Sequence, residues 1–117
     1  MNEYLYLFVG EERSEKAKQM GVIWRDKRLA ASHLYKALDN IGIEWDNCDF
    51  ANVFEGEIDK IKSFNGPVIA MGRKVEKALK KENISHYFIY HPATRGSLRR
   101  IENYLSHVEE ALVSLPK

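Results

Sequence analysis

Tyr87-Phe88-Ile89-Tyr90-His91-Pro92-Ala93-Thr94-Arg95-Gly96-Ser97 is the stretch that decides how this chain folds and where its chemistry lies. Its first four residues favour a strand, and Pro92 ends that strand because proline has no N–H to donate to a sheet. Small, turn-forming residues then lead to a final helix that Ser97 is expected to cap. His91 thus emerges at the carboxyl end of a strand, where open α/β sheets bind ligands. A plain strand-end histidine that only hydrogen-bonds a neighbour is the simpler interpretation.

Three other apolar runs have the length of a strand, at Tyr4–Val9, Asp49–Phe54 and Val68–Met71. Their hydrophobicity is nearly continuous, which favours strands covered on both faces. Apolar residues recur at helical spacing between and after these runs. The expected helices are 27–40 (with Asp26 as N-cap), 55–64, 73–81 and 97–114, and Ser14 could cap a short helix that ends at Met20. The alternation predicts an α/β fold, three-layer α/β/α, with a four-stranded, mostly parallel sheet.

The length of 117 residues suits a single domain, 1–117, with a modest core. No apolar run approaches the length of a membrane span, and the N-terminus lacks the basic region and cleavage site of a leader. Cys48 is the only cysteine, so one chain cannot form a disulfide or supply the cysteines of an iron–sulfur cluster. We therefore expect a cytoplasmic protein without a membrane partner.

The net charge of +1 conceals a strong asymmetry along the chain. Residues 39–59 contain seven acids and no lysine or arginine, whereas residues 73–100 contain eight bases and two acids. The basic segment flanks His91 and would attract phosphates. Two solvated helix faces of opposite charge are the alternative interpretation.

If the four strands are parallel, their carboxyl ends bring separated residues to one edge of the sheet. The residues expected there are Gly10, Glu11, Glu12, Arg13, Asn52, Gly72, Arg73 and His91. An asparagine amide can read the polar edge of a nucleobase, and a histidine can donate to an oxygen that gains charge. A carboxylate can activate water or stabilise a developing cation. Trp24, in the loop 21–25, offers a face for base stacking, or else plugs the core.

The order of these segments resembles the uracil-DNA glycosylase superfamily over most of the chain. Val9-Gly10-Glu11 is similar to its first-strand motif, Phe50-Ala51-Asn52-Val53 to its Thr-Asn-Val segment, and Tyr90-His91-Pro92-Ala93 to its His-Pro-Ser motif. Trp24 and the residues up to Leu29 resemble the segment that follows the family's base-stacking aromatic, and Val68–Gly72 resembles its third strand. Arg13-Ser14 stands where the family has proline, Glu12 stands in place of an aspartate, and Ala93-Thr94 departs from Ser-Pro.

The resemblance implies a minimal, divergent member that lacks the iron–sulfur cluster and needs no cofactor or metal. It implies base-binding roles for Gly10, Trp24 and Asn52, and catalytic roles for His91 and for Glu12 or Glu11. The implied partner is uracil-containing DNA, duplex or single-stranded. Its target base would rotate out of the stack and into a pocket. The bases expected to hold phosphates are Arg73, Arg95, Arg99 and Arg100.

Two other interpretations stay open at this point. The chain could be a non-catalytic binder of a nucleotide, a nucleic acid or a protein on the same fold, which the altered first motif favours. It could also be a generic doubly wound domain, because short buried strands recur in many folds and fold does not fix function.

Overall fold

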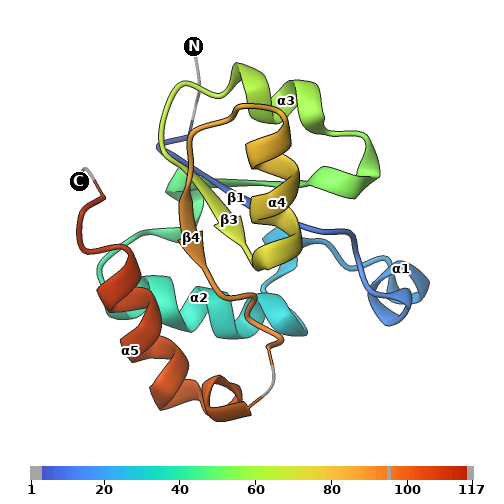
Figure 1. Cartoon of the computed structure of the whole chain (residues 1–117). Coiled ribbons are helices and arrows are strands. Elements are labelled where there is room, and N and C mark those ends of the chain that lie inside the picture. Colours follow the sequence, from blue (N-terminus) through green and yellow to red (C-terminus); the bar gives the residue numbers. More distant parts are fainter. Residues whose placement is uncertain (1–3, 95, 116–117) are drawn as a thin grey trace.

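The computed structural model describes residues 4–94 and 96–115, and Figure 1 shows their arrangement. Four strands form one sheet: β1 (Tyr6–Gly10), β2 (Cys48–Asn52), β3 (Val68–Met71) and β4 (Tyr87–Ile89). The α-helices are α1 (Glu15–Met20), α2 (Ala30–Asn40), α3 (Ile58–Ser63), α4 (Arg73–Lys81) and α5 (Ile101–Ala111). Short 3₁₀ turns are η1 (Trp24–Asp26), η2 (Trp45–Asn47), η3 (Val53–Glu55) and η4 (Gly96–Arg99).

The sheet is four-stranded, has the order β2-β1-β3-β4 and is parallel throughout, which confirms the α/β expectation. The register pairs Gly10 with Asn52 and Met71 with Ile89. The last residues of all four strands therefore lie along one edge. That edge carries the segments that follow Gly10, Asn52, Met71 and Ile89, as the sequence predicted.

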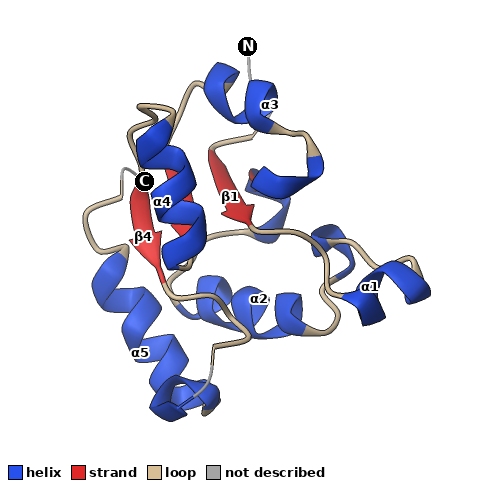
Figure 2. Ribbon diagram, turned by 45° about the vertical axis from the view of Figure 1, so that its right-hand side comes forward, coloured by secondary structure: helices blue, strands red, loops and turns tan. Residues whose placement is uncertain are grey.

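Helices cover both faces of the sheet, which explains the nearly continuous apolar runs (Figures 1 and 2). On one face, Phe8, Phe50 and Met71 belong to a buried cluster with residues of α2 and α5. On the other face, Val9 and Ala70 belong to a second cluster with residues of α3 and α4. Successive strand residues point to opposite faces, so both must be apolar when both faces are covered.

Two helix starts differ from the sequence prediction. Asp26 does not cap α2, which begins four residues later at Ala30, because Lys27 and Leu29 have φ values of 59° and 55° that no α-helix tolerates. The Asp26 carboxylate instead accepts the N–H of Ile23 and closes η1. Ser97 does not cap the last helix either, since 96–99 form η4 and α5 begins at Ile101. Ser14 does cap α1, by accepting the N–H of Ala17 at 3.1 Å.

Strand β4 lies at the edge of the sheet, and α5 covers the point where it leads into His91. The backbone N–H of Tyr90 donates to Nε2 of His107 at 2.9 Å, and the hydroxyl of Tyr104 donates to the carbonyl of Tyr90 at 2.7 Å. Side chains thus satisfy both backbone groups of the residue before His91, where no further strand pairs. None of the helices within 4–94 and 96–115 has the length and apolar character needed to cross a membrane.

We expect the free energy of unfolding to fall as the pH drops from about 7.5 to about 5.5, above the range where carboxylates titrate. Burial lowers the pKa of His107, opposed by the nearby Glu110 carboxylate, and burial likewise lowers the pKa of His91. Such a histidine binds its proton more readily when unfolded, so stability present above about pH 6.5 is lost below it. Urea denaturation at a series of pH values measures the effect.

His107→Gln distinguishes the contribution of His107 to this pH dependence from that of His91. A glutamine oxygen can still accept the Tyr90 N–H, but glutamine does not titrate. The variant should lose less stability than the wild type over the same pH interval. An identical pH dependence in both proteins would exclude a contribution of His107.

Candidate functional site

A pocket of about 410 Å³ opens at the carboxyl edge of the sheet, between the β1–α1 segment, η1, the start of α2 and the His91 loop. Its apolar wall includes Ala17, Val22, Leu29 and Ala31. Its polar and aromatic lining comprises Glu11, Glu12, Arg13, Ser14, Lys16, Trp24, Arg28 and His91. This volume and mixed lining are typical of sites for small molecules.

Trp24 is held in the pocket wall by its neighbours in η1. The adjacent Arg25 extends its guanidinium to the carbonyls of Trp45 and Cys48, and lies 4.9 Å from the ring centre of Phe50. The indole of Trp24 is nearly parallel to the Phe50 ring, with centroids 6.3 Å apart and an interplanar angle of 16°. Trp24 is therefore anchored from the β2 side and only half-buried on the pocket side.

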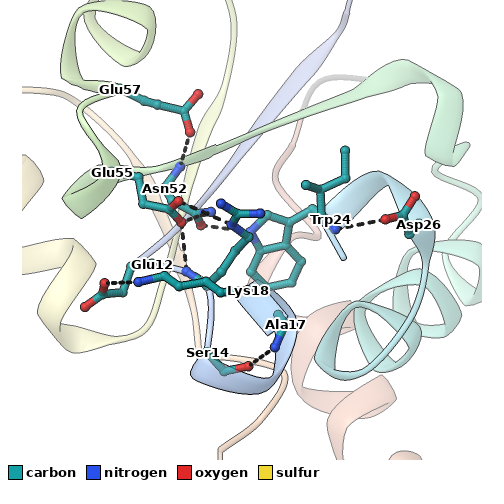
Figure 3. A network of polar contacts seen from close by, with 11 residues as sticks. Glu12, Ser14, Ala17, Lys18, Trp24, Asp26, Asn52, Glu55 and Glu57 are labelled. Atoms are coloured by element: carbon teal, nitrogen blue, oxygen red, sulfur yellow. Dashed lines mark hydrogen bonds and ion pairs between the residues drawn. The ribbon is translucent and has the colours of Figure 1, made fainter. Parts of the chain in front are cut away.

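Asn52 lies behind Trp24 and does not line the pocket (Figure 3). The indole Nε1–H of Trp24 donates to Asn52 Oδ1 at 2.9 Å, and Asn52 Nδ2 donates to Glu55 Oε2 at 2.8 Å. The side chain is buried, and its backbone N–H donates to Glu57 at 3.0 Å. Both ends of the amide expected to read a base are thus bonded within the protein.

Glu55 connects Asn52 to the first loop of the pocket. Its carboxylate accepts the backbone N–H of Arg13 at 2.8 Å and the Arg13 Nε–H at 3.3 Å. Burial alone would raise the pKa of Glu55, but the hydrogen bonds and charge of Arg13, together with the Asn52 amide, outweigh it and lower that pKa. The negative charge of Glu55 is therefore well compensated, and the chain Trp24–Asn52–Glu55–Arg13 links two walls of the pocket.

His91 lies against Trp24 in the lining of the pocket, with ring centroids 5.8 Å apart in an edge-to-face arrangement. Its Nδ1 accepts the backbone N–H of Ala93 at 3.0 Å, so the neutral ring carries its proton on Nε2. Burial lowers the pKa of His91, opposed by the carboxylate of Glu11. At neutral pH His91 is consequently an uncharged imidazole with one N–H to offer.

The two acids of the first loop differ in environment. A Cβ atom built on Gly72 would lie 3.6 Å from Cβ of His91 and 3.9 Å from Oε2 of Glu11, so these two side chains flank the same glycine. The carbonyl of Glu11 also accepts the N–H of Phe54, which fixes its backbone. Glu12 is exposed and forms an ion pair with Lys18 at 3.1 Å. Both acids line the pocket, and Glu11 is the one whose side chain lies beside the same glycine as His91.

Of the predicted phosphate-binding residues that the structure describes, Arg73, Arg99 and Arg100 do not line the pocket. Arg73 lies 4.1 Å above the ring of Phe88, and donates to Glu76 and to the hydroxyl of Tyr90. Arg99 and Arg100 are exposed on and after η4, and Arg95 lies outside the described residues. The cations that line the pocket are Arg13, Lys16 and Arg28. Only Arg13 could be expected there from sequence, since Lys16 and Arg28 reach the pocket through the packing of α1 and the turn before α2.

The single cysteine, Cys48, adds no reactive group to the pocket. Burial raises the pKa of the Cys48 thiol to about 12, although Arg25 acts against this, so the thiol is not a nucleophile near neutral pH. Within 4–94 and 96–115, no cluster of three or more His, Cys, Asp or Glu side chains could hold a metal ion.

Gly10→Ala should disturb the pocket without removing any polar group. A Cβ atom at this position would lie 2.8 Å from Asn52 Oδ1 and 2.9 Å from Cζ2 of Trp24, closer than such atoms approach in proteins. We expect a loss of about 1–3 kcal/mol in the free energy of unfolding, as for other overpacked sites, and a shift in tryptophan fluorescence. Urea denaturation and emission spectra measure both.

Gly42→Ala is the control for a glycine change, because no atom lies within 4 Å of its Cβ position. Its positive φ of 79° gives it a backbone cost, but its fluorescence should match that of the wild type. An unchanged spectrum in Gly10→Ala would mean that Trp24 is not packed against Gly10.

Comparison with known proteins adds no assignment for this pocket. No model of a protein family matches the chain, and no curated protein matches it either.

Proposed function

We propose that this chain recognises uracil or another deaminated base in DNA and hydrolyses its N-glycosidic bond. The observation that carries the proposal is the meeting of Glu11, His91 and Trp24 in one pocket at the carboxyl edge of the sheet. A carboxylate, a neutral imidazole donor and an aromatic wall are the groups that this reaction uses. The resemblance of the strand ends to the uracil-DNA glycosylase superfamily supports the same assignment and a three-layer α/β/α classification.

The proposed reaction begins with a base rotated out of the DNA stack and into the pocket, where it contacts Trp24. Leaving the stack costs a few kcal/mol, least for a mispaired or single-stranded base. The bond between C1′ and the base nitrogen breaks with its electron pair moving onto the base. The Nε2–H of His91 donates to the base oxygen on which that negative charge accumulates.

Glu11 supplies the complementary charge on the sugar side. Its carboxylate stabilises the positive charge that develops at C1′ and accepts a proton from the attacking water, whose oxygen then bonds to C1′. The products are the base anion and an abasic sugar; Glu11 passes its proton to solvent, and the anion takes up a proton from solvent to become the free base. Glu12 is the alternative acid if the loop rearranges, because it also lines the pocket.

In this proposal the DNA backbone is held by cations around the pocket mouth. Lys16 and Arg28 are exposed at the pocket, and Arg99 and Arg100 are exposed on the neighbouring segment. The further contribution of Arg73 and Arg95 stays a prediction from the sequence. Contacts of this kind position DNA of any sequence and weaken as salt is added.

A second candidate function is the binding of a nucleotide or nucleic acid without turnover. The observation that favours it is the Asn52 amide, whose two ends are bonded to Trp24 and Glu55 rather than directed at the pocket. A protein of this kind would bind its ligand through the pocket cations and release it unchanged.

An oligonucleotide with one deoxyuridine distinguishes the two functions. Incubation followed by alkali should cleave the wild-type product at the abasic position, and His91→Ala and Glu11→Gln should each slow this about a hundredfold. Glu109→Gln, an exposed change on α5, should retain the wild-type rate. Salt-sensitive binding of the oligonucleotide without cleavage would replace the first function by the second.

A further inference from the structure

The acceptor oxygen of Asn52 is occupied by a side chain of the protein itself. Oδ1 accepts the indole Nε1–H of Trp24 at 2.9 Å, and only 7% of the Asn52 surface is exposed (Figure 3). The indole is a flat, aromatic heterocycle with one N–H, and it lies over Gly10, where a Cβ atom would meet both partners at less than 3 Å. The sheet edge therefore holds a cradle that fits a planar ring carrying an N–H donor.

Glu55 determines which end of the amide faces this cradle. Its Oε2 accepts Nδ2 of Asn52 at 2.8 Å, and a carboxylate can only accept at that position while it is ionised. The two hydrogen bonds from Arg13 hold the carboxylate in place. If the amide turned over, oxygen would face carboxylate and N–H would face N–H, and both hydrogen bonds would be lost. The amide is thereby fixed with its oxygen toward the cradle.

We propose that Trp24 is an internal occupant of the Asn52 oxygen, which a ligand ring with its own N–H displaces, and that Glu55 restricts this position to N–H donors. The inference rests on the proposed function, since it takes the ligand to be a base. It assigns Glu55 as a positioning residue that acts through Asn52. The favoured class is lactam or imide rings, because rings with an unprotonated nitrogen at that position would set two acceptors against each other.

The surroundings of Trp24 permit the exchange. Its side chain is half-buried and lines the open pocket, and its indole N–H donates to the Asn52 oxygen. Its ring neighbours are Phe50 and His91, with centroids 6.3 Å and 5.8 Å away. Rotation of the side chain away from Asn52 breaks this hydrogen bond and the ring contacts with Phe50 and His91, and a ligand N–H restores the hydrogen bond. Binding therefore carries the cost of displacing the indole, which lowers the apparent affinity.

Two methylated bases test the proposal without any glycosidic bond to cleave. 1-Methyluracil keeps the N3–H donor, and 1,3-dimethyluracil has nearly the same shape but no N–H. Their affinities for the wild type, Trp24→Phe, Trp45→Phe and Glu55→Gln are measured by titration, with the two indole N–H signals followed by NMR. Trp45→Phe is the matched control, because the indole it removes donates to the carbonyl of Arg25, away from the Asn52 oxygen.

We expect 1-methyluracil to shift the Trp24 N–H signal and to bind Trp24→Phe about fivefold more tightly than the wild type, as the competing hydrogen bond is gone. The dimethyl analogue should gain no affinity in this variant. The amide of Glu55→Gln can accept or donate, so this variant should show a smaller ratio between the affinities for 1-methyluracil and 1,3-dimethyluracil. Thermal denaturation of each variant checks that it is folded.

The outcomes separate the inference from the function on which it rests. Binding of 1-methyluracil that leaves the Trp24 signal unmoved, with equal or weaker affinity in Trp24→Phe, overturns the exchange and keeps base binding. An unchanged preference in a folded Glu55→Gln overturns the positioning role. If neither the wild type nor any variant binds either compound, both base recognition and the exchange are wrong. Binding of 1-methyluracil by Trp24→Phe alone supports base recognition and the exchange.

Discussion

The structure depends on β1 lying between β2 and β3 with both of its faces buried. This central position places Gly10 beside Asn52 on one side and directs the following loop toward the end of β3. Residues separated by dozens of positions along the chain therefore lie close together at the ends of neighbouring strands. Because Leu7, Phe8 and Val9 are fully buried, the register of β1 is set by packing on both faces, and a shift of one residue would exchange their faces. The pocket inherits its geometry from that register.

The charged groups at the sheet edge form two sets: a closed part, whose members bond to one another, and an open part, whose members line the pocket. In the closed part, the charge of Glu55 is matched by Arg13 and the Asn52 amide, so it serves structure. In the open part, Glu11 lines the pocket together with a neutral His91 and with cations that a ligand in the pocket could contact. Buried polar networks are favourable only when every member has a partner, and the closed part meets this condition. The hydrogen bonds of the closed part therefore hold the walls of the pocket in fixed positions.

The sequence predicts the sheet better than it predicts the site. Strand Val68–Met71 and helix Arg73–Lys81 have the expected bounds, because Asn65-Gly66-Pro67 and Gly72 are strong local signals. Helix α2 starts later than the sequence predicts, because Lys27 and Leu29 adopt positive φ values that their residue types do not indicate. Parallel strands predicted that the strand ends carrying Asn52 and His91 would lie along one edge, but Trp24 lies in η1, outside the strands. Which groups the Asn52 amide would bond could not be read from sequence, since Trp24 is 28 residues away.

A tryptophan at position 24 does something that a phenylalanine in the same wall could not. Either ring could stack against a base and pack on Phe50, but only the indole can donate to the Asn52 oxygen. Without a donor, that oxygen would be buried and unpaired whenever the pocket is empty, at a cost of about 1–3 kcal/mol. The indole removes this cost from the empty protein, and the same bond then competes with any ligand that needs the oxygen. Stability of the empty site and affinity for a base are therefore opposed through one hydrogen bond.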